Sequence, residues 1–171
     1  MPVPQQKFRE IVFQALYSYD IARASEEDIL ELLMNELSVT RKVVKEAQER
    51  VSKILEKKED IDALIAKASL SYEFARIQTV ERNILRLGVF ELLFDDSIPP
   101  RVAITEGMRL ARKFGTPESA SFVNAVLDNL YKSNLGEKVD PVQIDLSVQS
   151  LLKSEELARE ASQNPPKQTE E

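Results

Sequence analysis

Apolar residues recur every three or four positions along most of this chain, a spacing that predicts amphipathic α-helices. The densest stretch runs from Glu81 to Phe94, where apolar side chains would point to almost every side of a helix. A helix that is apolar nearly all round lies inside a bundle. Pro99 and Pro100 prevent this helix from continuing and favour the start of another. The pattern therefore predicts an all-α protein with a central helix over residues 79–94.

Cap residues mark the ends of several predicted helices. Ser25 opens a capping-box-like start, Thr40 can cap the next helix, and Thr116 precedes a proline and an acid. Gly115 is expected to end the preceding helix in the left-handed conformation. Gly88, inside the central helix, is expected to let another helix approach closely. These signals predict about seven helices, in two three-helix-like subdomains that share the central helix, plus an extra C-terminal helix.

The same periodicity predicts which side chains each helix buries. In the second, third and sixth helices it places Leu32, Leu55 and Val102 on or beside the apolar face. The lysines and glutamates of residues 42–53 are expected to form a solvated face, because their pairs at four-residue spacing stabilise a helix only weakly.

The character of the chain changes after residue 134. Residues 135–171 hold eight acidic and four basic side chains, so they carry −4 of the net charge of −6. Asp140 and Pro141 can start one more helix, and the polar tail after it is expected to be disordered. We predict a helical domain over residues 1–134 and an acidic extension over 135–171. The extension could fold back on the bundle, mediate self-association or cover a binding surface, and the sequence leaves these alternatives open.

The composition excludes many kinds of chemistry. The chain has no cysteine and no histidine, which excludes disulfides, Cys/His zinc sites and nucleophiles or bases of those types. It also lacks a glycine-rich phosphate loop and a nucleophile elbow. The paired acids Asp95 and Asp96 stand before a proline turn, where acids commonly form turns. We therefore expect no enzyme activity, no metal and no cofactor.

Two further features bear on location and partners. No apolar run approaches the roughly 20 residues of a membrane span, and the N-terminus lacks a signal-peptide segment. A cytoplasmic protein without a membrane partner is expected. The net charge argues against a general binder of nucleic-acid backbones, although residues 1–134 carry only −2 and leave room for a local basic patch.

Five segments follow one another in a characteristic order and spacing. They are QALYSYD from Gln14, VERNILRLGVFELLF from Val80, IPPRVAITEG, ARKFG, and ESASFVNAVLD from Glu118. Together they resemble the NusB family of bacterial transcription antitermination factors. The resemblance implies a non-enzymatic RNA-binding factor that acts with the ribosomal protein NusE on the boxA element of ribosomal-RNA leader transcripts, within an RNA polymerase antitermination complex.

The resemblance also implies which residues meet RNA. Lys7 and Arg9 fall on family positions that contact phosphates, and Gln14 and Phe122 fall on the same RNA-binding set. Phe122 is expected to offer a face to an unpaired base, a contact worth about 1–3 kcal/mol when exposed. An isolated aromatic in this segment fits the core equally well.

At positions 5 and 6 the sequence departs from the family pattern. Glutamines replace two of the expected N-terminal cations. Each missing phosphate contact should weaken RNA binding and flatten its dependence on salt. The departure leaves a second hypothesis open, a helical protein-interaction module in which RNA contact is largely lost.

Three residues fall on family positions implied to meet the partner, namely Tyr17, Glu81 and Arg76. Tyr17 and Glu81 are expected to converge on a groove that receives a segment of NusE. Alternatively, Tyr17 packs between helices and Glu81 interacts favourably with the start of its own helix. Tyr72, where the family usually has tryptophan, is expected to cover the core. Self-association as a homodimer also stays open.

Overall fold

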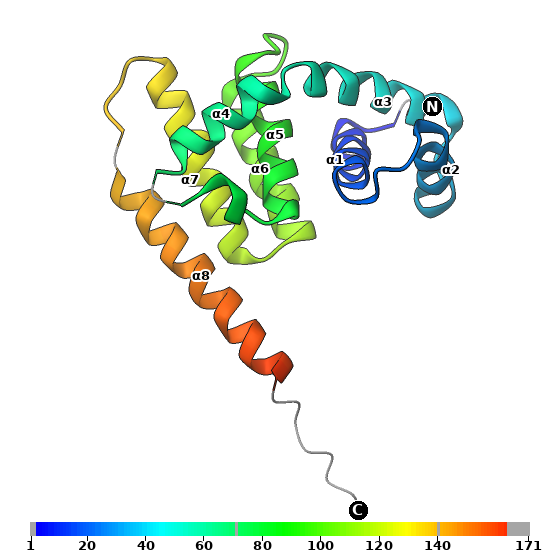
Figure 1. Ribbon diagram of the computed structural model, residues 1–171. Helices are drawn as coiled ribbons and strands as arrows, with labels where there is room; N and C mark the ends of the chain where they lie inside the picture. The colour runs from blue at the N-terminus through cyan, green and yellow to red at the C-terminus, as the bar shows by residue number, and fades with distance from the viewer. Residues whose placement is uncertain (1–2, 71, 140, 164–171) are drawn as a thin grey trace, which may run out of the picture.

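The computed structural model describes residues 3–70, 72–139 and 141–163, and these residues form α-helices joined by short turns (Figure 1). The helices are α1 (Gln5–Ala22), α2 (Glu26–Leu37), α3 (Arg41–Glu56), α4 (Lys58–Ala68), α5 (Thr79–Leu93), α6 (Pro100–Phe114), α7 (Pro117–Asn134) and α8 (Pro141–Gln163), with a short 3₁₀ helix, η1 (Phe74–Arg76), before α5. The described ranges contain no β-strand. The predicted all-α class is confirmed.

The helices form two packed units that meet at α5. Helices α1, α2 and α3 contact one another on one side, and α4 to α7 contact one another on the other. Helix α5 touches α1, α3, α4, α6 and α7, which confirms its predicted central place. The second unit has four helices, because α4 packs against both α5 and α7. None of the helices in the described ranges combines the length and apolar character needed to span a bilayer.

Two glycines let α5 and α6 approach α7 closely. A β-carbon at Gly88 would lie 2.9 Å from Cδ1 of Leu127, and one at Gly107 would lie 2.8 Å from the same atom. Leu127 is fully buried, so it has little room to move aside. The close approach predicted at Gly88 is confirmed, and Gly107 adds a second one that the sequence reading missed.

Side-chain caps begin α2, α3 and α7 as predicted. The hydroxyls of Ser25 and Thr40 each accept a hydrogen bond from the backbone N–H three residues later, at 3.2 and 3.4 Å. At α7, Thr116 and Ser119 form a reciprocal capping box, in which each hydroxyl accepts from the other residue's backbone N–H at 3.2 Å. Such caps satisfy amide groups that a helix leaves unpaired at its start.

Gly115 differs from its prediction. Its backbone angles are φ −120° and ψ −134°, so it ends α6 outside the left-handed region. Glycine is nevertheless needed there for space, because a β-carbon would lie 2.9 Å from the carbonyl oxygen of Ala111 and 2.9 Å from Oγ of Ser119. The requirement is steric rather than conformational.

Three predicted core residues lie at the surface. Leu32, Leu55 and Val102 are all exposed. Periodicity predicts the direction of a side chain but not the extent of the surface packed against it.

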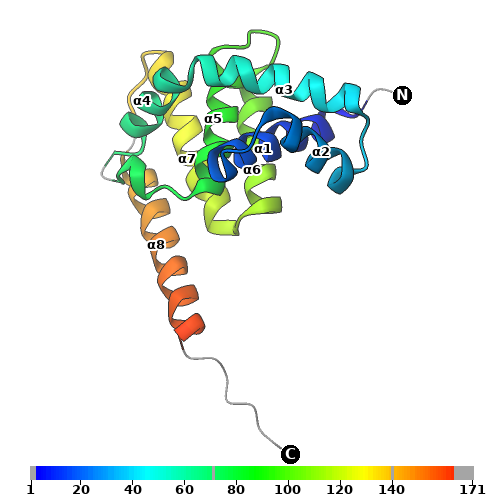
Figure 2. The same ribbon diagram turned by 45° about the vertical axis from the view of Figure 1, so that its right-hand side comes forward.

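Helix α8 confirms the helix predicted from Asp140 and Pro141. It packs against α7, and its C-terminal part extends beyond the bundle, as the views in Figures 1 and 2 both show. The residues it buries are Ile144, Val148 and Leu151. The predicted disordered tail falls on residues 164–171, which lie outside the described residues.

Candidate nucleic-acid and partner interface

The predicted RNA-binding residues of α1 lie on different sides of the helix. Lys7 and Gln14 are partly exposed and, being seven residues apart, share one face. Arg9 is turned inward, and its side chain is only 10% exposed. Its Nε donates to both carboxylate oxygens of Glu91, at 3.1 and 3.0 Å. The expectation of a surface arginine is therefore corrected, because in this conformation Arg9 neutralises a buried glutamate of α5.

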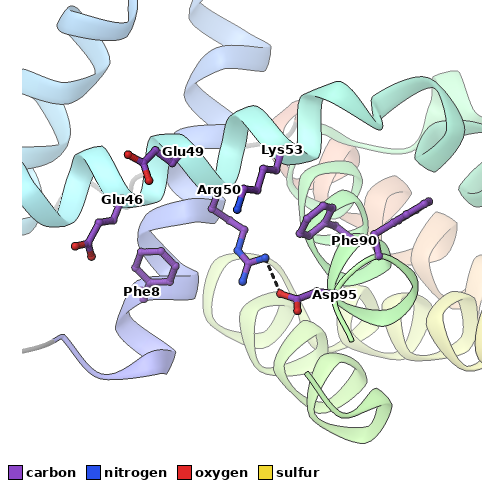
Figure 3. A pocket seen from close by; sticks show the side chains of 8 residues that line it. Phe8, Glu46, Glu49, Arg50, Lys53, Phe90 and Asp95 are labelled. Atoms are coloured by element: carbon purple, nitrogen blue, oxygen red, sulfur yellow. Dashed lines mark hydrogen bonds and ion pairs between the residues drawn. The ribbon is translucent and has the colours of Figure 1, made fainter. Parts of the chain in front are cut away.

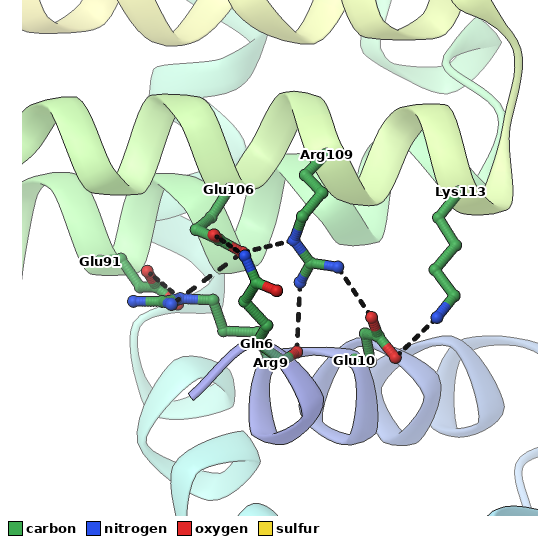
Figure 4. Close-up of polar contacts among 7 residues, drawn as sticks. All are labelled: Gln6, Arg9, Glu10, Glu91, Glu106, Arg109 and Lys113. Atoms are coloured by element: carbon green, nitrogen blue, oxygen red, sulfur yellow. Dashed lines mark hydrogen bonds and ion pairs between the residues drawn. The ribbon is translucent and has the colours of Figure 1, made fainter. Parts of the chain in front are cut away.

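Arg9 belongs to a polar cluster that fixes α1 against α5 and α6 (Figure 4). Arg109 of α6 donates to Glu10 at 2.7 Å and to Glu106 at 2.7 Å, and Lys113 donates to Glu10 at 2.9 Å. Burial alone would raise the pKa of Glu10, but the hydrogen bonds from Arg109 and Lys113 outweigh it and hold the pKa below its ordinary value. The sequence reading missed this cluster.

Glu91 shows the opposite balance within the same cluster. Burial raises its pKa above the ordinary value, although the charge of Arg9 and its hydrogen bonds act against this. Apolar residues surround Glu91 in the second half of α5, and this was a visible signal that a buried cation pairs with it. What the sequence does not show is which cation of another helix does so.

Phe122 lies in the core. Its side chain is 0% exposed, and the ring of Tyr72 meets it edge-on, with ring centroids 5.5 Å apart and an interplanar angle of 88°. The expectation of an exposed stacking face is corrected, because Phe122 belongs to the hydrophobic core and Tyr72, the predicted cover of that core, packs edge-on against it. That Phe122 contacts a base stays a prediction, and such a contact requires Tyr72 to move away from the Phe122 ring.

Tyr17 and Gln14 line a groove of about 400 Å³ between α1, α2, α5 and α6. The other lining residues are Phe13, Ser18, Leu33, Glu36, Val80 and Phe114. The floor is mostly apolar and aromatic, and its polar groups come from α1 and α2. A groove of this composition fits a partner segment with an apolar anchor beside a hydrogen-bonding or basic group.

Glu81 does not share that groove, although its neighbour Val80 lines it. The Glu81 residue is 5% exposed, and its Oε1 accepts a hydrogen bond from Oγ of Ser119 at 2.5 Å. Its Oε2 is buried without a hydrogen-bond partner among the described residues. The predicted convergence of Tyr17 and Glu81 is therefore corrected, since Glu81 links α5 to the capping box of α7.

Arg76 lies beside Tyr72 and not beside Tyr17. It is exposed in η1, and its guanidinium carbon is 5.9 Å from the centre of the Tyr72 ring. The predicted site residues thus form two groups. Lys7, Gln14 and Tyr17 follow one face of α1, whereas Arg76, Glu81 and Phe122 gather near the start of α7.

A second hollow, of about 410 Å³, lies between α3 and the C-terminal end of α5 (Figure 3). Arg50 stands over the ring of Phe90 at 5.3 Å and donates to Asp95 at 2.6 Å. Asp95 also accepts from the backbone N–H of Ser97 at 3.0 Å, which confirms the predicted turn role. Acidic and basic residues alternate around this hollow, so it does not form a basic surface for phosphates.

The described ranges contain no group of three or more His, Cys, Asp or Glu side chains placed to hold a metal ion. What the geometry does provide is a largely neutral helical body with one apolar groove, one partly exposed face of α1 and a second surface near the start of α7. These features suit recognition of macromolecules by surface contact.

The model of the NusB family matches residues 6–132 of this chain. The chain belongs to the NusB family. It is 37% identical over 135 residues to the transcription antitermination protein NusB of Chlamydia pneumoniae, covering 78% of this chain and 84% of that protein. It is 37% identical over 123 residues to the protein of the same name from Geobacter sulfurreducens, covering 71% of this chain and 89% of that protein.

Solved structures agree with the family assignment. NusB of T. maritima superposes with a TM-score of 0.68 and 33% identity, over 85% of this chain and 99% of that one. A crystal structure of NusB and NusE in complex with double-stranded RNA has a TM-score of 0.66 and 28% identity, over 75% of this chain and 96% of that one. The family match ends at residue 132, before α8 begins.

Proposed function

We propose that this protein is a non-enzymatic, RNA-binding transcription antitermination factor that acts with NusE on the boxA element of ribosomal-RNA leader transcripts. In this role it is a component of an RNA polymerase antitermination complex. The observation that carries the proposal is the match to a NusB solved together with NusE and RNA, over 75% of this chain. The groove beside Tyr17 supplies a surface of suitable shape for the protein partner.

The proposal assigns different surfaces to the two partners. NusE binds the groove between α1, α2, α5 and α6, with Tyr17 as an aromatic contact and Gln14 at its edge. RNA binds near the N-terminal turn of α1, where Lys7 supplies a cation, and near the start of α7. Arg76, expected from the family resemblance to meet NusE, is reassigned to this RNA surface because it lies beside Tyr72 and does not line the groove. Arg9 contributes by holding α1 in place rather than by touching phosphate.

A second candidate function is the helical interaction module in which RNA contact is largely lost. The burial of Arg9 favours it, since glutamines already stand at positions 5 and 6. With Arg9 turned inward, few cations remain at the surface of the N-terminal turn of α1. On this alternative NusE still binds the groove, but RNA affinity does not depend on Lys7.

The two candidates are separated by titrating labelled single-stranded boxA leader RNA, and a scrambled RNA, with the full chain in the presence and absence of NusE. We expect preferential binding of boxA RNA, strengthened by NusE. Lys7→Glu should weaken it, and the matched change Lys67→Glu, on an exposed part of α4, should have little effect. Binding to NusE without any effect of RNA sequence or of Lys7 would favour the interaction module.

The role of the groove in NusE binding is tested by comparing Tyr17→Ala with the control variant Tyr131→Ala. Both tyrosines are half-buried, and of the two only Tyr17 lines the groove. Loss of an aromatic anchor should reduce NusE affinity by roughly 2 kcal/mol or more. Isothermal titration measures the affinity, and thermal melting of both variants shows whether the fold is retained. Equal affinities for the two variants would place the NusE surface elsewhere.

A further inference from the structure

Helix α8 contacts the body through one narrow stripe. Ile144, Val148 and Leu151 are buried at helical spacing, whereas Leu146 on the outer side is 58% exposed. The hydroxyl of Ser147 is 3.5 Å from the carbonyl oxygen of Ser121, the residue just before Phe122. Helix α8 therefore runs directly across the N-terminal half of α7.

Further along α8, Glu155 approaches the second group of predicted site residues. Burial raises its pKa first, and the charge of Glu81 raises it further, while a hydrogen bond from Gln78 and the charges of Arg76 and Arg159 act against this. The same two glutamates raise the pKa of Tyr72, after burial. Glu155 thus hydrogen-bonds to Gln78, the residue before α5, and lies within reach of the charges of Glu81 and Arg76.

We infer that α8 covers, in cis, the RNA-facing surface formed by the start of α7, η1 and the start of α5, and that RNA binds there only when α8 detaches. The inference rests on the proposed function and concerns how the same site is regulated. It assigns a role to α8, which lies beyond the region matched by the family.

Charge makes the two occupants mutually exclusive. Helix α8 carries the acids Asp145, Glu155, Glu156 and Glu160 and the bases Lys153 and Arg159. Its net negative charge lies where RNA phosphates would lie, so the helix and the nucleic acid repel each other. Arg76, the exposed cation of this surface, also interacts with Glu155 while α8 is docked.

The contact is built so that it can open. Oε2 of Glu81 and Oε1 of Glu155 are buried without a hydrogen-bond partner in the part of the chain that the structure describes. Unpaired buried oxygens and two neighbouring like charges oppose docking. A short apolar stripe and a few polar contacts at the surface hold α8 in place, whereas the bundle beneath has its own core. Segments with few buried contacts open before the rest of a protein does.

The first test compares Leu151→Asp with Leu146→Asp in the full chain. Both changes put the same charge on α8, but only Leu151 is buried, at 3% exposure. If α8 is docked in about nine of ten molecules, releasing it should tighten binding of single-stranded boxA RNA about tenfold. Trypsin should cut faster after Lys153 and Arg159 in Leu151→Asp, while the melting temperature of the bundle stays near that of the parent.

The second test shifts α8 in the opposite direction. Glu155→Gln removes one of the two like charges, so the repulsion from Glu81 is lost. Docking should tighten, so trypsin should cut α8 more slowly and RNA affinity should fall severalfold. This variant changes no buried apolar contact, so it remains informative even where Leu151→Asp fails to fold.

The outcomes separate the inference from the proposed function. If the parent binds boxA RNA as tightly as Leu151→Asp while trypsin shows that α8 has been released, the proposed function stands and the inference is overturned. If Leu146→Asp acts like Leu151→Asp, added charge and not release is responsible, and the inference is again overturned. If neither the parent nor the released variant binds RNA with or without NusE, the proposed function fails and the inference fails with it.

Discussion

The two interfaces that bury glutamates differ in what those carboxylates meet. Where α1 packs on α5 and α6, three glutamates face three cations, in the set Glu10, Glu91, Glu106, Arg9, Arg109 and Lys113. Where α8 approaches the start of α5, the like charges of Glu81 and Glu155 oppose each other, and each carboxylate keeps one buried oxygen unpaired. The first interface is complementary in charge and the second is not.

This difference indicates which contact is permanent. A buried carboxylate that is paired with a cation is costly to separate, because separation leaves a charge without compensation. A buried carboxylate oxygen that has no hydrogen-bond partner gains hydration when the contact opens. We therefore interpret the α1 contact as part of the fixed fold and the α8 contact as one that opens in solution.

Breaking the complementary interface should have the largest effect. Arg9→Ala leaves Glu91 buried without its cation, so the free energy of unfolding should fall by about 3–5 kcal/mol. Urea denaturation followed by circular dichroism measures this loss. Replacing Arg9 by Met and Glu91 by Leu together should restore most of it. A loss below about 1 kcal/mol for the single variant would show that the pair does not fix α1.

A smaller effect is expected at Glu81. Ser119→Ala removes the hydroxyl that donates to its Oε1 and also breaks the capping box, so it should cost roughly 2 kcal/mol. Ser121→Ala, on the same helix and exposed, should cost less than about 0.5 kcal/mol. Thermal unfolding of the pair gives both values. Similar costs would mean that Glu81 is not held by Ser119.

Glu10 and Glu155 should respond oppositely to pH, whereas Glu91, whose pKa is raised within the first interface, opposes the response of Glu10 there. The pKa of Glu10 is lowered from 4.5, so its stabilising contribution is present above that value and is lost as pH falls through the lowered pKa. The pKa of Glu155 is raised from 4.5, so docking of α8 is strongest below that value and weakens as pH rises through the raised pKa.

Amide hydrogen exchange, corrected for intrinsic rates, checks this contrast. Acidification from pH 7.5 towards pH 4 should increase protection in α8 while protection in α1 falls or stays level. Glu155→Gln should abolish the gain in α8, although Glu81, Arg76, Tyr72 and Arg159 remain. Parallel changes in both helices would show that the two interfaces are not opposed.

The smallest effect is expected where a charge pair is exposed. Arg41 and Glu27 are 3.1 Å apart, with side chains 53% and 59% exposed. Water screens such pairs, so Arg41→Ala should cost less than about 1 kcal/mol. The same denaturation experiment that measures Arg9→Ala provides the value. If Arg41→Ala lowered the free energy of unfolding as much as Arg9→Ala does, burial would not be what makes the Arg9 pair important.

Much of the fold follows from local signals. The caps at Ser25, Thr40 and Thr116 were predictable because each depends on a side chain and the backbone next to it. A glycine inside an apolar helix predicted the close approach at Gly88, but not that Leu127 of α7 is the residue it meets. The exposure of Leu32 could not be predicted in this way, since it depends on how far a neighbouring helix extends.

The candidate site was less predictable than the fold. Arg9 and Phe122 matched a family pattern, yet both are buried here. Arg9 pairs with acids of α5 and α6, and Phe122 lies in the hydrophobic core, where Tyr72 meets it. The helix beginning at Pro141 was expected, but its position over Ser121 and Glu81 was not. Contacts between residues far apart in the chain decide these features, and a single sequence does not show which pairs form.

The central claim is that this chain promotes antitermination through boxA RNA and NusE. Single-round transcription across a terminator downstream of a boxA leader, in a bacterial extract depleted of its own NusB, tests it most directly. Adding the full chain should raise the fraction of transcripts that pass the terminator, and a scrambled boxA template should abolish the rise. Unchanged read-through on the boxA template, with a folded chain and NusE present, would contradict the claim.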